Sequence, residues 1–418
     1  MTIYYVDPLN GSSANNGLTS ADNAVGNTGP FGSYNDCFTG SIVGGITNGD
    51  IVYLVASTMD YIPYQTLLSQ TLSNIDFGTT GGIAQIRAVN PTTLEEDGTK
   101  YTFTGNDQQY NARFPNRQHF GFVYHNCRII GYWHNYSSGG TSVYVNCEFT
   151  DAYGGITFSS NTLSFYLDNC NMMFRNCKMY KAGTGNYTHF SQRDGSIYSG
   201  GGSQYESCEF YGFNLGAALG LQRDSSFYDC RFKDCEHAIE FELRSNGGDH
   251  QVYNCIIDNM ASNAFEQDEQ NSTLVNWPKR TKFYGNLLND IGGYVYYYRE
   301  PTATEIDFYI PADAGGLGQR EADGFLDWEG NIYQNATSGV HSLPFNSEML
   351  ARGWHSVQGN TAATFGLTHD NGFGLMLATG DHTTFNYFVG TSAGMGTFLK
   401  DFTETIVSGS VPEFGDVF

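Results

Sequence analysis

A short pattern of apolar and polar positions recurs along the middle of the chain. Each copy has an aromatic residue or Val, then a small polar residue, then Cys, then a run in which apolar positions alternate. Successive cysteines are 20 to 31 residues apart, and two later copies carry Asn286 and Asn331 in place of Cys. The cysteines of the pattern are Cys127, Cys147, Cys177, Cys208, Cys230 and Cys255.

The alternation has a period of two residues, which is typical of β-strands, and no helical period accompanies it. A repeat of this length predicts a solenoid, because one coil of short strands cannot bury its apolar face alone, whereas stacked coils can. Neighbouring coils would lie roughly 4.8 Å apart. The uneven steps then correspond to loops of different length between strands at fixed places. We therefore expect an all-β solenoid in which the cysteines form an inward column.

Three segments carry a resemblance to a known group of proteins. The recurring pattern resembles the right-handed parallel β-helix proteins of the pectate-lyase-like superfamily. The opening Ile3–Pro8 with its Asn/Gly turns, and the strand-like Gly49–Leu54, resemble the first coils of bacteriophage and bacterial members. Residues 390–396 resemble the element that closes such domains. The resemblance implies a right-handed parallel β-helix with a small β-rich C-terminal cap.

The expected β-helix covers residues 1–335, and its repeats are clearest over 120–335. Residues 301–326 contain two prolines, adjacent glycines and several acids, which predict a protruding loop. Residues 336–418 are expected to form the β-rich closing segment.

The amino-acid composition supports a β-rich fold, and the net charge argues against two classes of partner. The chain has 51 Gly, 29 Tyr and 30 Phe, as β-rich proteins with many turns do. Its net charge is −23, with 20 Lys and Arg against 43 acids, which argues against nucleic acid and anionic membranes as partners. The sequence shows no signal peptide and no apolar run long enough to span a membrane.

The nine cysteines include no CxxC pair, which disfavours a zinc site. Thiols in an inward column are expected to stay reduced, with disulfides between stacked neighbours as the alternative. The ten histidines show no metal-binding spacing, so no cofactor is expected. Asp7, Asn10 and Asn16 fall in turns, where their side chains are expected to cap the backbone; weak calcium binding is the alternative.

Aligning the coils after each cysteine brings four carboxylates together. Alternation places Glu240 and Glu242 on one outward face, with Glu266 and Asp268 beside them on the next coil. Expected separations are roughly 7 Å along a strand and roughly 5 Å between coils. These bracket the separations of carboxylate pairs in glycosidases, so the four acids are the candidate catalytic residues.

Side chains near the acids are candidates for glycan binding. They are Tyr296, Tyr298, Arg244, Arg299, Gln222 and His237. Three other interpretations stay open: the acids are ordinary solvent-facing residues of an acidic protein, the arginines form structural ion pairs with them, or the tyrosines contact another protein. Binding of a glycan or a cation without chemistry is a further alternative.

The resemblance and the absence of a leader favour one functional hypothesis. We expect a bacteriophage virion surface protein that is made in the host cytoplasm: tailspike-like, fibre-associated or decorating the head. Its partners would be other virion proteins and host surface polysaccharide, and the resemblance implies a homotrimer. The alternative is a polysaccharide-degrading glycoside hydrolase or lyase that uses the acidic patch. A role without catalysis is the favoured expectation.

Overall fold

The computed structural model describes residues 1–21, 27–38, 46–61, 84–104, 121–131, 133–136, 141–153, 156–157, 165–168, 171–182, 190–193, 203–213, 217–221, 225–242, 250–268, 281–298, 326–329, 332–340 and 355–358. Contacts divide the chain into two compact units, Met1–Cys208 and Glu209–Phe418. Each unit is described by itself. All the regular structure within the described ranges is β-strand.

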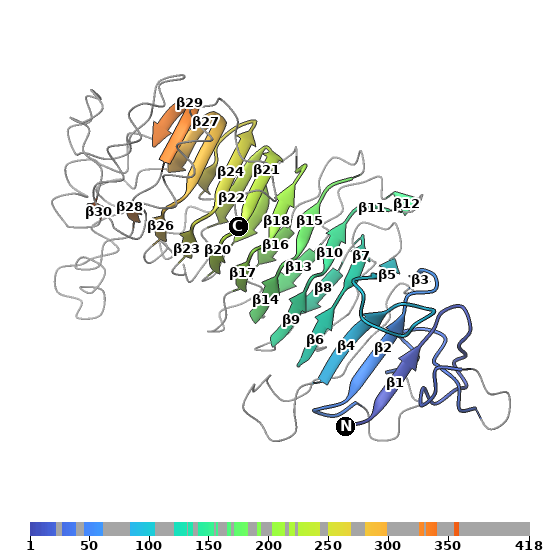
Figure 1. Cartoon of the computed structure of the whole chain (residues 1–418). Coiled ribbons are helices and arrows are strands. Elements are labelled where there is room, and N and C mark those ends of the chain that lie inside the picture. Colours follow the sequence, from blue (N-terminus) through green and yellow to red (C-terminus); the bar gives the residue numbers. More distant parts are fainter. Residues whose placement is uncertain are drawn as a thin grey trace, which may run out of the picture. The chain divides into compact units, whose positions relative to one another are not determined.

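In the N-terminal unit, parallel strands form three faces, here called its first, second and third sheets (Figure 1). The first sheet has the order β1 (Ile3–Val6), β2 (Ile51–Val55), β4 (Ala84–Val89), β6 (Phe122–His125), β9 (Thr141–Val145), β14 (Asn171–Arg175), β17 (Ser203–Glu206). The second has the order β3 (Asp60–Tyr61), β5 (Tyr101–Thr104), β7 (Cys127–Ile130), β10 (Glu148–Thr150), β15 (Lys178–Tyr180). The third contains β8 (Trp133–Tyr136), β13 (Phe165–Asp168) and β16 (Phe190–Arg193). A small antiparallel pair joins β11 (Ala152–Tyr153) to β12 (Ile156–Thr157).

The C-terminal unit repeats this arrangement. Its first sheet has the order β20 (Ser225–Tyr228), β23 (His250–Tyr253), β26 (Thr281–Tyr284), β28 (Leu326–Glu329), β30 (His355–Gln358). Its second sheet has the order β18 (Glu209–Tyr211), β21 (Arg231–Cys235), β24 (Ile256–Met260), β27 (Leu287–Tyr298), β29 (Ile332–Val340). Its third sheet has the order β19 (Ala217–Leu221), β22 (His237–Glu242), β25 (Phe265–Asp268), followed by the second half of β27.

Successive turns of the chain add strands to the same sheets, and the register partner of each strand lies one turn away in the sequence. In the first sheet, for example, Tyr124 is paired with Tyr144, and Tyr144 with Phe174. Parallel strands connected in this way are right-handed crossovers. Each unit is therefore a right-handed parallel β-helix, which confirms the fold class expected from the sequence.

The recurring pattern marks one corner of every coil. The residue before each cysteine has a positive φ of 52° to 58°, the left-handed conformation that Asn and Asp tolerate best. The backbone turns there from the first sheet into the second. In the last described copy Gly285 takes this conformation, with φ 65°. The small polar residue in the pattern is thus explained by the corner.

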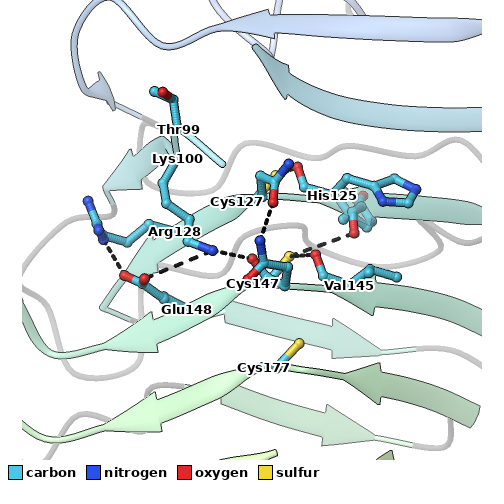
Figure 2. Close-up of polar contacts among 12 residues, drawn as sticks. Thr99, Lys100, His125, Cys127, Arg128, Val145, Cys147, Glu148 and Cys177 are labelled. Carbon is cyan, nitrogen blue, oxygen red and sulfur yellow. Dashed lines mark hydrogen bonds and ion pairs between the residues drawn. The ribbon is translucent and has the colours of Figure 1, made fainter. Parts of the chain in front are cut away.

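The cysteines point into the core, as expected. Cys127, Cys147 and Cys177 lie on successive coils of the N-terminal unit (Figure 2). All eight cysteines of the described ranges are buried and free, so the prediction of reduced thiols is confirmed for them. Asn286 replaces Cys in a later coil, and its side chain compensates by accepting from Cys255 N (2.9 Å) and donating to Val252 O (3.0 Å).

Aromatic rings form a second interior column beside the thiols. Tyr124, Tyr144, Phe174 and Tyr205 stack ring on ring with centroids 4.9, 5.2 and 4.9 Å apart and planes within 11° of parallel. All four are fully buried. The ring separation follows the strand spacing, so each coil supplies one ring to a continuous apolar column.

Turn chemistry organises the first coil. The buried Asp7 carboxylate accepts from the backbone N of Leu9 (3.0 Å) and Asn10 (3.2 Å), from Asn10 Nδ2 (2.9 Å) and from Ser57 Oγ (2.6 Å). Asn16 Oδ1 accepts from Leu18 N (3.1 Å). These are the capping contacts expected of such residues.

A buried carboxylate sits deeper in the same unit. Asp60 Oδ2 accepts from Tyr101 Oη (2.6 Å) and Tyr34 N (2.7 Å), and Tyr34 Oη lies 3.2 Å from Tyr124 Oη. Burial raises the pKa of Asp60 to about 6, although the hydrogen bonds from Tyr101 and Tyr34 oppose the shift. The folded protein therefore binds the Asp60 proton more tightly than the unfolded chain does.

This raised pKa predicts a pH dependence of stability. Protonated Asp60 contributes stability below its ordinary pKa of 3.8, and the contribution is lost as the pH rises through about 6. We expect the free energy of unfolding of the wild type, minus that of Asp60→Asn, to fall by on the order of 3 kcal/mol between pH 4 and pH 7. Urea titrations of both proteins across this range measure the difference. Parallel pH curves would contradict the raised pKa.

Two expected features fall mainly outside the described ranges. Of the predicted loop at 301–326, only Leu326 is described, as the first residue of β28. Of the predicted closing segment at 336–418, the described parts are the end of β29 and β30, which pairs in parallel with β28.

Candidate functional site

Two neighbouring strands in the third sheet of the C-terminal unit carry the four candidate acids. The register of β22 and β25 pairs Glu240 with Glu266 and Glu242 with Asp268. The alignment of these two coils expected from the sequence is therefore confirmed. Glu240 and Glu266 are both partly exposed. For Glu242 and Asp268 the backbone is described and the side chains lie outside the description.

His237, at the start of β22, contacts the acid of the next coil. Its Nδ1 lies 3.3 Å from Glu266 Oε2 and 3.2 Å from the carbonyl oxygen of Asn263. The Asn263 side chain donates from Nδ2 to the same Glu266 oxygen at 3.0 Å. The side chains of His237 and Glu266 are 15% and 23% exposed, so the pair is reachable from solvent yet partly shielded. We call His237, Glu240, Asn263 and Glu266 the acid–histidine cluster.

The contacts around His237 fix its tautomer. Both groups near Nδ1, a carbonyl oxygen and a carboxylate oxygen, accept hydrogen bonds, so Nδ1 carries the hydrogen. In the neutral ring Nε2 then carries the lone pair. The cluster thus combines a carboxylate, a second carboxylate on the neighbouring strand and an imidazole nitrogen able to accept a proton, which are the groups that general acid–base chemistry uses.

Two glycines of the next coil hold the turn that supplies Asn263. Gly293 N donates to Ser262 O at 2.8 Å. A Cβ on Gly292 would lie 2.3 Å from the carbonyl oxygen of Ala261, and one on Gly293 would lie 2.5 Å from Asn263 Oδ1. Because only glycine allows β27 to pass this close, the pair positions the turn and the amide that holds Glu266.

The expected alignment of the tyrosines was wrong by one residue. Tyr296 is the register partner of Phe265, Tyr297 of Glu266 and Tyr298 of Gln267. The sequence alignment had placed Tyr296 and Tyr298 beside the two acids. The pairing of β27 with the preceding coil keeps one offset throughout, since Ile256 and Leu287 are 31 residues apart and so are Phe265 and Tyr296. This is the step from Cys255 to Asn286, whereas the alignment expected from the sequence used a step of 30. Tyr297 therefore replaces them as the register neighbour of Glu266.

The other predicted glycan-binding residues are placed only in part. His237 belongs to the acid–histidine cluster, whereas Gln222, Arg244 and Arg299 lie outside the described residues. Sequence reasoning missed Asn263, which carries no motif of its own. Its position opposite Gly292 and Gly293, one coil away, was the available signal.

The second sheet of the N-terminal unit carries a charged group that the sequence reasoning also missed. Arg128 Nε lies 2.7 Å from Glu148 Oε2, and Lys100 Nζ lies 3.9 Å from Glu148 Oε1 (Figure 2). Lys100 also donates to the carbonyl oxygen of Asn146. Burial, and then the Glu148 carboxylate, raise the pKa of nearby Tyr180. These contacts connect three coils and are explained as structural ion pairing.

Within the described ranges, no group of three or more His, Cys, Asp or Glu side chains is placed to hold a metal ion. The same part of the chain contains no helix with the length and apolar character needed to cross a membrane.

Comparison with known proteins gives distant likenesses only. No family model and no curated protein matches the sequence. Among solved structures, the chain is similar to a rhamnogalacturonan lyase, with 12% identity over 91% of this chain and 96% of that chain and a TM-score of 0.39. It is similar to pectate lyase Pel9A, with 14% identity over 91% and 88% and a TM-score of 0.41. It is also similar to ORF18 of Geobacillus virus E2, with 11% identity over 56% and 54% and a TM-score of 0.20. The fold assignment rests on the strand register described above.

Proposed function

We propose that this chain is a bacteriophage virion surface protein that contacts host surface glycans through the third sheet of its C-terminal unit. The observation that carries the glycan contact is the acid–histidine cluster: Glu266 is held by Asn263 and His237, beside Glu240. Sugar hydroxyls both donate and accept hydrogen bonds, and this cluster supplies fixed acceptors and donors at a partly exposed surface. The resemblance of residues 3–8 to phage β-helix proteins supports the virion assignment.

The acid–histidine cluster is held on rigid backbone, which favours glycan binding there. The cluster is built on strands β22 and β25 and on a turn clamped by Gly292 and Gly293, so little conformational entropy is lost when a ligand binds. Other virion proteins are the proposed partners of the remaining surface, and a homotrimer is the proposed assembly.

The binding proposal is tested with purified capsular and lipopolysaccharide preparations immobilised on a biosensor. Wild-type protein is expected to bind at least one, and Asn263→Ala to bind about tenfold more weakly, because Glu266 loses the donor that holds it. Ser262→Ala, one residue away in the same turn, is the matched control and should bind as the wild type does. Equal binding by all three proteins would contradict the assigned surface. Antibody labelling of purified particles tests the virion assignment.

The second candidate function is cleavage of a polysaccharide, either by hydrolysis or by the elimination reaction of a lyase. It is favoured by the register pairing of Glu240 with Glu266, because partners on adjacent strands are about 5 Å apart, close to the separation that retaining glycosidases use. His237 Nε2 is the candidate proton acceptor for a lyase reaction. In either reaction Glu240 and Glu266 would contact the substrate.

Product analysis separates the two functions. If the chain is an enzyme, incubation with its polysaccharide should release new reducing ends or unsaturated sugars, and Glu266→Gln should slow release by a factor of about 10² to 10⁴. Glu209→Gln, an acid in the second sheet of the same unit, is the matched control. Binding without products from any bound polysaccharide would leave the non-catalytic function and exclude this one.

A further inference from the structure

Three tyrosines form an external column on the first sheet of the C-terminal unit. Tyr228 is the register partner of Tyr253, and Tyr253 of Tyr284. Their ring centroids are 5.4 and 5.1 Å apart, with planes 6° and 11° from parallel. Unlike the interior rings, all three are partly exposed. We call these three residues the tyrosine ladder.

A second row of polar side chains runs beside the ladder. Ser226, Gln251 and Lys282 are register partners on the same three strands, two residues before each tyrosine, and are also partly exposed. Tyr228 Oη donates to Gln251 Oε1 at 3.1 Å, which links the two rows. Each coil therefore presents one phenol and one further polar side chain at the same place on the surface.

The stacking decides which part of the rings a ligand can reach. Tyr253 has a neighbouring ring on each face, so it offers its edge and its hydroxyl to solvent. A ligand that matches this surface must offer hydrogen-bonding groups at intervals of one coil, about 4.8 Å. A linear polysaccharide in an extended conformation does so, because its sugar rings follow one another at nearly this spacing and each carries hydroxyl groups.

The charge of the protein indicates whether the polysaccharide is charged or uncharged. The whole chain has a net charge of −23, which repels polyanions at long range. The six residues of the two rows contain one cation, Lys282, and no acid, so they provide no array of positive charge to overcome this repulsion. The favoured ligand is therefore an uncharged polysaccharide.

We propose that the tyrosine ladder and the row Ser226, Gln251 and Lys282 bind a linear, uncharged polysaccharide with one sugar residue per coil. This inference rests on the proposed glycan-contacting function and adds to it a second surface and the charge class of the glycan. The acid–histidine cluster lies on a different sheet of the same unit, so the two surfaces can be altered separately.

The test uses the full chain and a printed array of purified bacterial surface polysaccharides, grouped as uncharged or anionic. Affinities for any bound polysaccharide are then measured for three variants. Tyr253→Ser removes the central ring, whereas Tyr253→Phe keeps the ring stack and removes only the hydroxyl. Tyr53→Ser is the matched control, because Tyr53 is a partly exposed ring on the first sheet of the N-terminal unit, tilted 47° from Tyr5 instead of stacked.

The wild type is expected to bind uncharged polysaccharides. Tyr253→Ser should bind about tenfold or more weakly, and Tyr53→Ser should bind as the wild type does. Tyr253→Phe should bind several-fold more weakly with an unchanged Tm, which a purely structural role of the ring would not produce.

Two results would overturn this inference alone: unchanged affinity in both Tyr253 variants, or binding restricted to anionic polysaccharides. A wild type that binds no polysaccharide on the array would overturn it together with the proposed glycan contact. The failure of the inference is thus distinguishable from the failure of the function.

Discussion

Replacing Cys208 with Asp should cost at least about 4 kcal/mol of the free energy of unfolding, because it buries an unpaired charge. Cys208 is fully buried, and its Sγ lies 3.5 Å from the carbonyl oxygens of both Phe174 and Glu206. A carboxylate at this place would face two acceptors and no donor among these contacts, so it would be both desolvated and repelled.

The control for this prediction lies one residue earlier. Ser207 is exposed at the coil corner with φ 52°, and Asp229 occupies the equivalent corner of a later coil with φ 55°. Ser207→Asp introduces the same charge and should change stability by less than about 0.5 kcal/mol. Urea denaturation of both variants measures the difference. Equal stabilities would show that Cys208 does not point into the core.

The second large effect is expected at Phe174, in the middle of the interior aromatic column. Its ring lies 5.2 Å from that of Tyr144 and 4.9 Å from that of Tyr205, nearly parallel to both. Phe174→Ala would leave a cavity between the two rings and should cost about 3–5 kcal/mol. The adjacent Met173 is half-buried on the other face of β14, so Met173→Ala should cost clearly less.

Thermal and chemical unfolding of these two variants checks the column. A loss for Phe174→Ala no larger than that for Met173→Ala would mean that coils are not stabilised mainly by stacked interior rings. A loss confined to Phe174→Ala would support the column.

Much of the fold could be predicted from the sequence because one local rule governs every coil. The small polar residue before each cysteine, such as Asn146, marks a left-handed corner, and alternation around it assigns the inward positions. Glu240 lies 10 residues after Cys230 and Glu266 lies 11 after Cys255, so their pairing includes one extra residue before β25, and the apolar alternation on either side of the two acids is what aligned them.

Two parts of the site were not predicted correctly. The tyrosine run was misplaced because its coil was aligned 30 residues after the preceding one, although the corner residues Cys255 and Asn286 are 31 apart and the strands keep that step. The contact between His237 and Glu266 depends on the shape of the turn at Asn263, which alternation does not describe.

The Arg128–Glu148 ion pair and the tyrosine ladder could both have been predicted from the repeating pattern. Arg128 and Glu148 each directly follow a cysteine of the pattern, so the register alone would have paired them. The tyrosine ladder occupies the position two residues before Cys230, Cys255 and Asn286. Comparing equivalent positions across coils reveals both groups.

Every surface proposed above depends on the parallel, coil-by-coil register of the strands, and an engineered disulfide tests that register most directly. Gln251 and Lys282 are register partners on β23 and β26, and adjacent strands place Cα atoms about 5 Å apart, within disulfide range. The double variant Gln251→Cys with Lys282→Cys should form an intramolecular disulfide on mild oxidation, identified by mass spectrometry of the linked peptides. Ser226→Cys with Lys282→Cys, two coils apart, should form none. A disulfide in the second variant but not in the first would contradict the stacked β-helix.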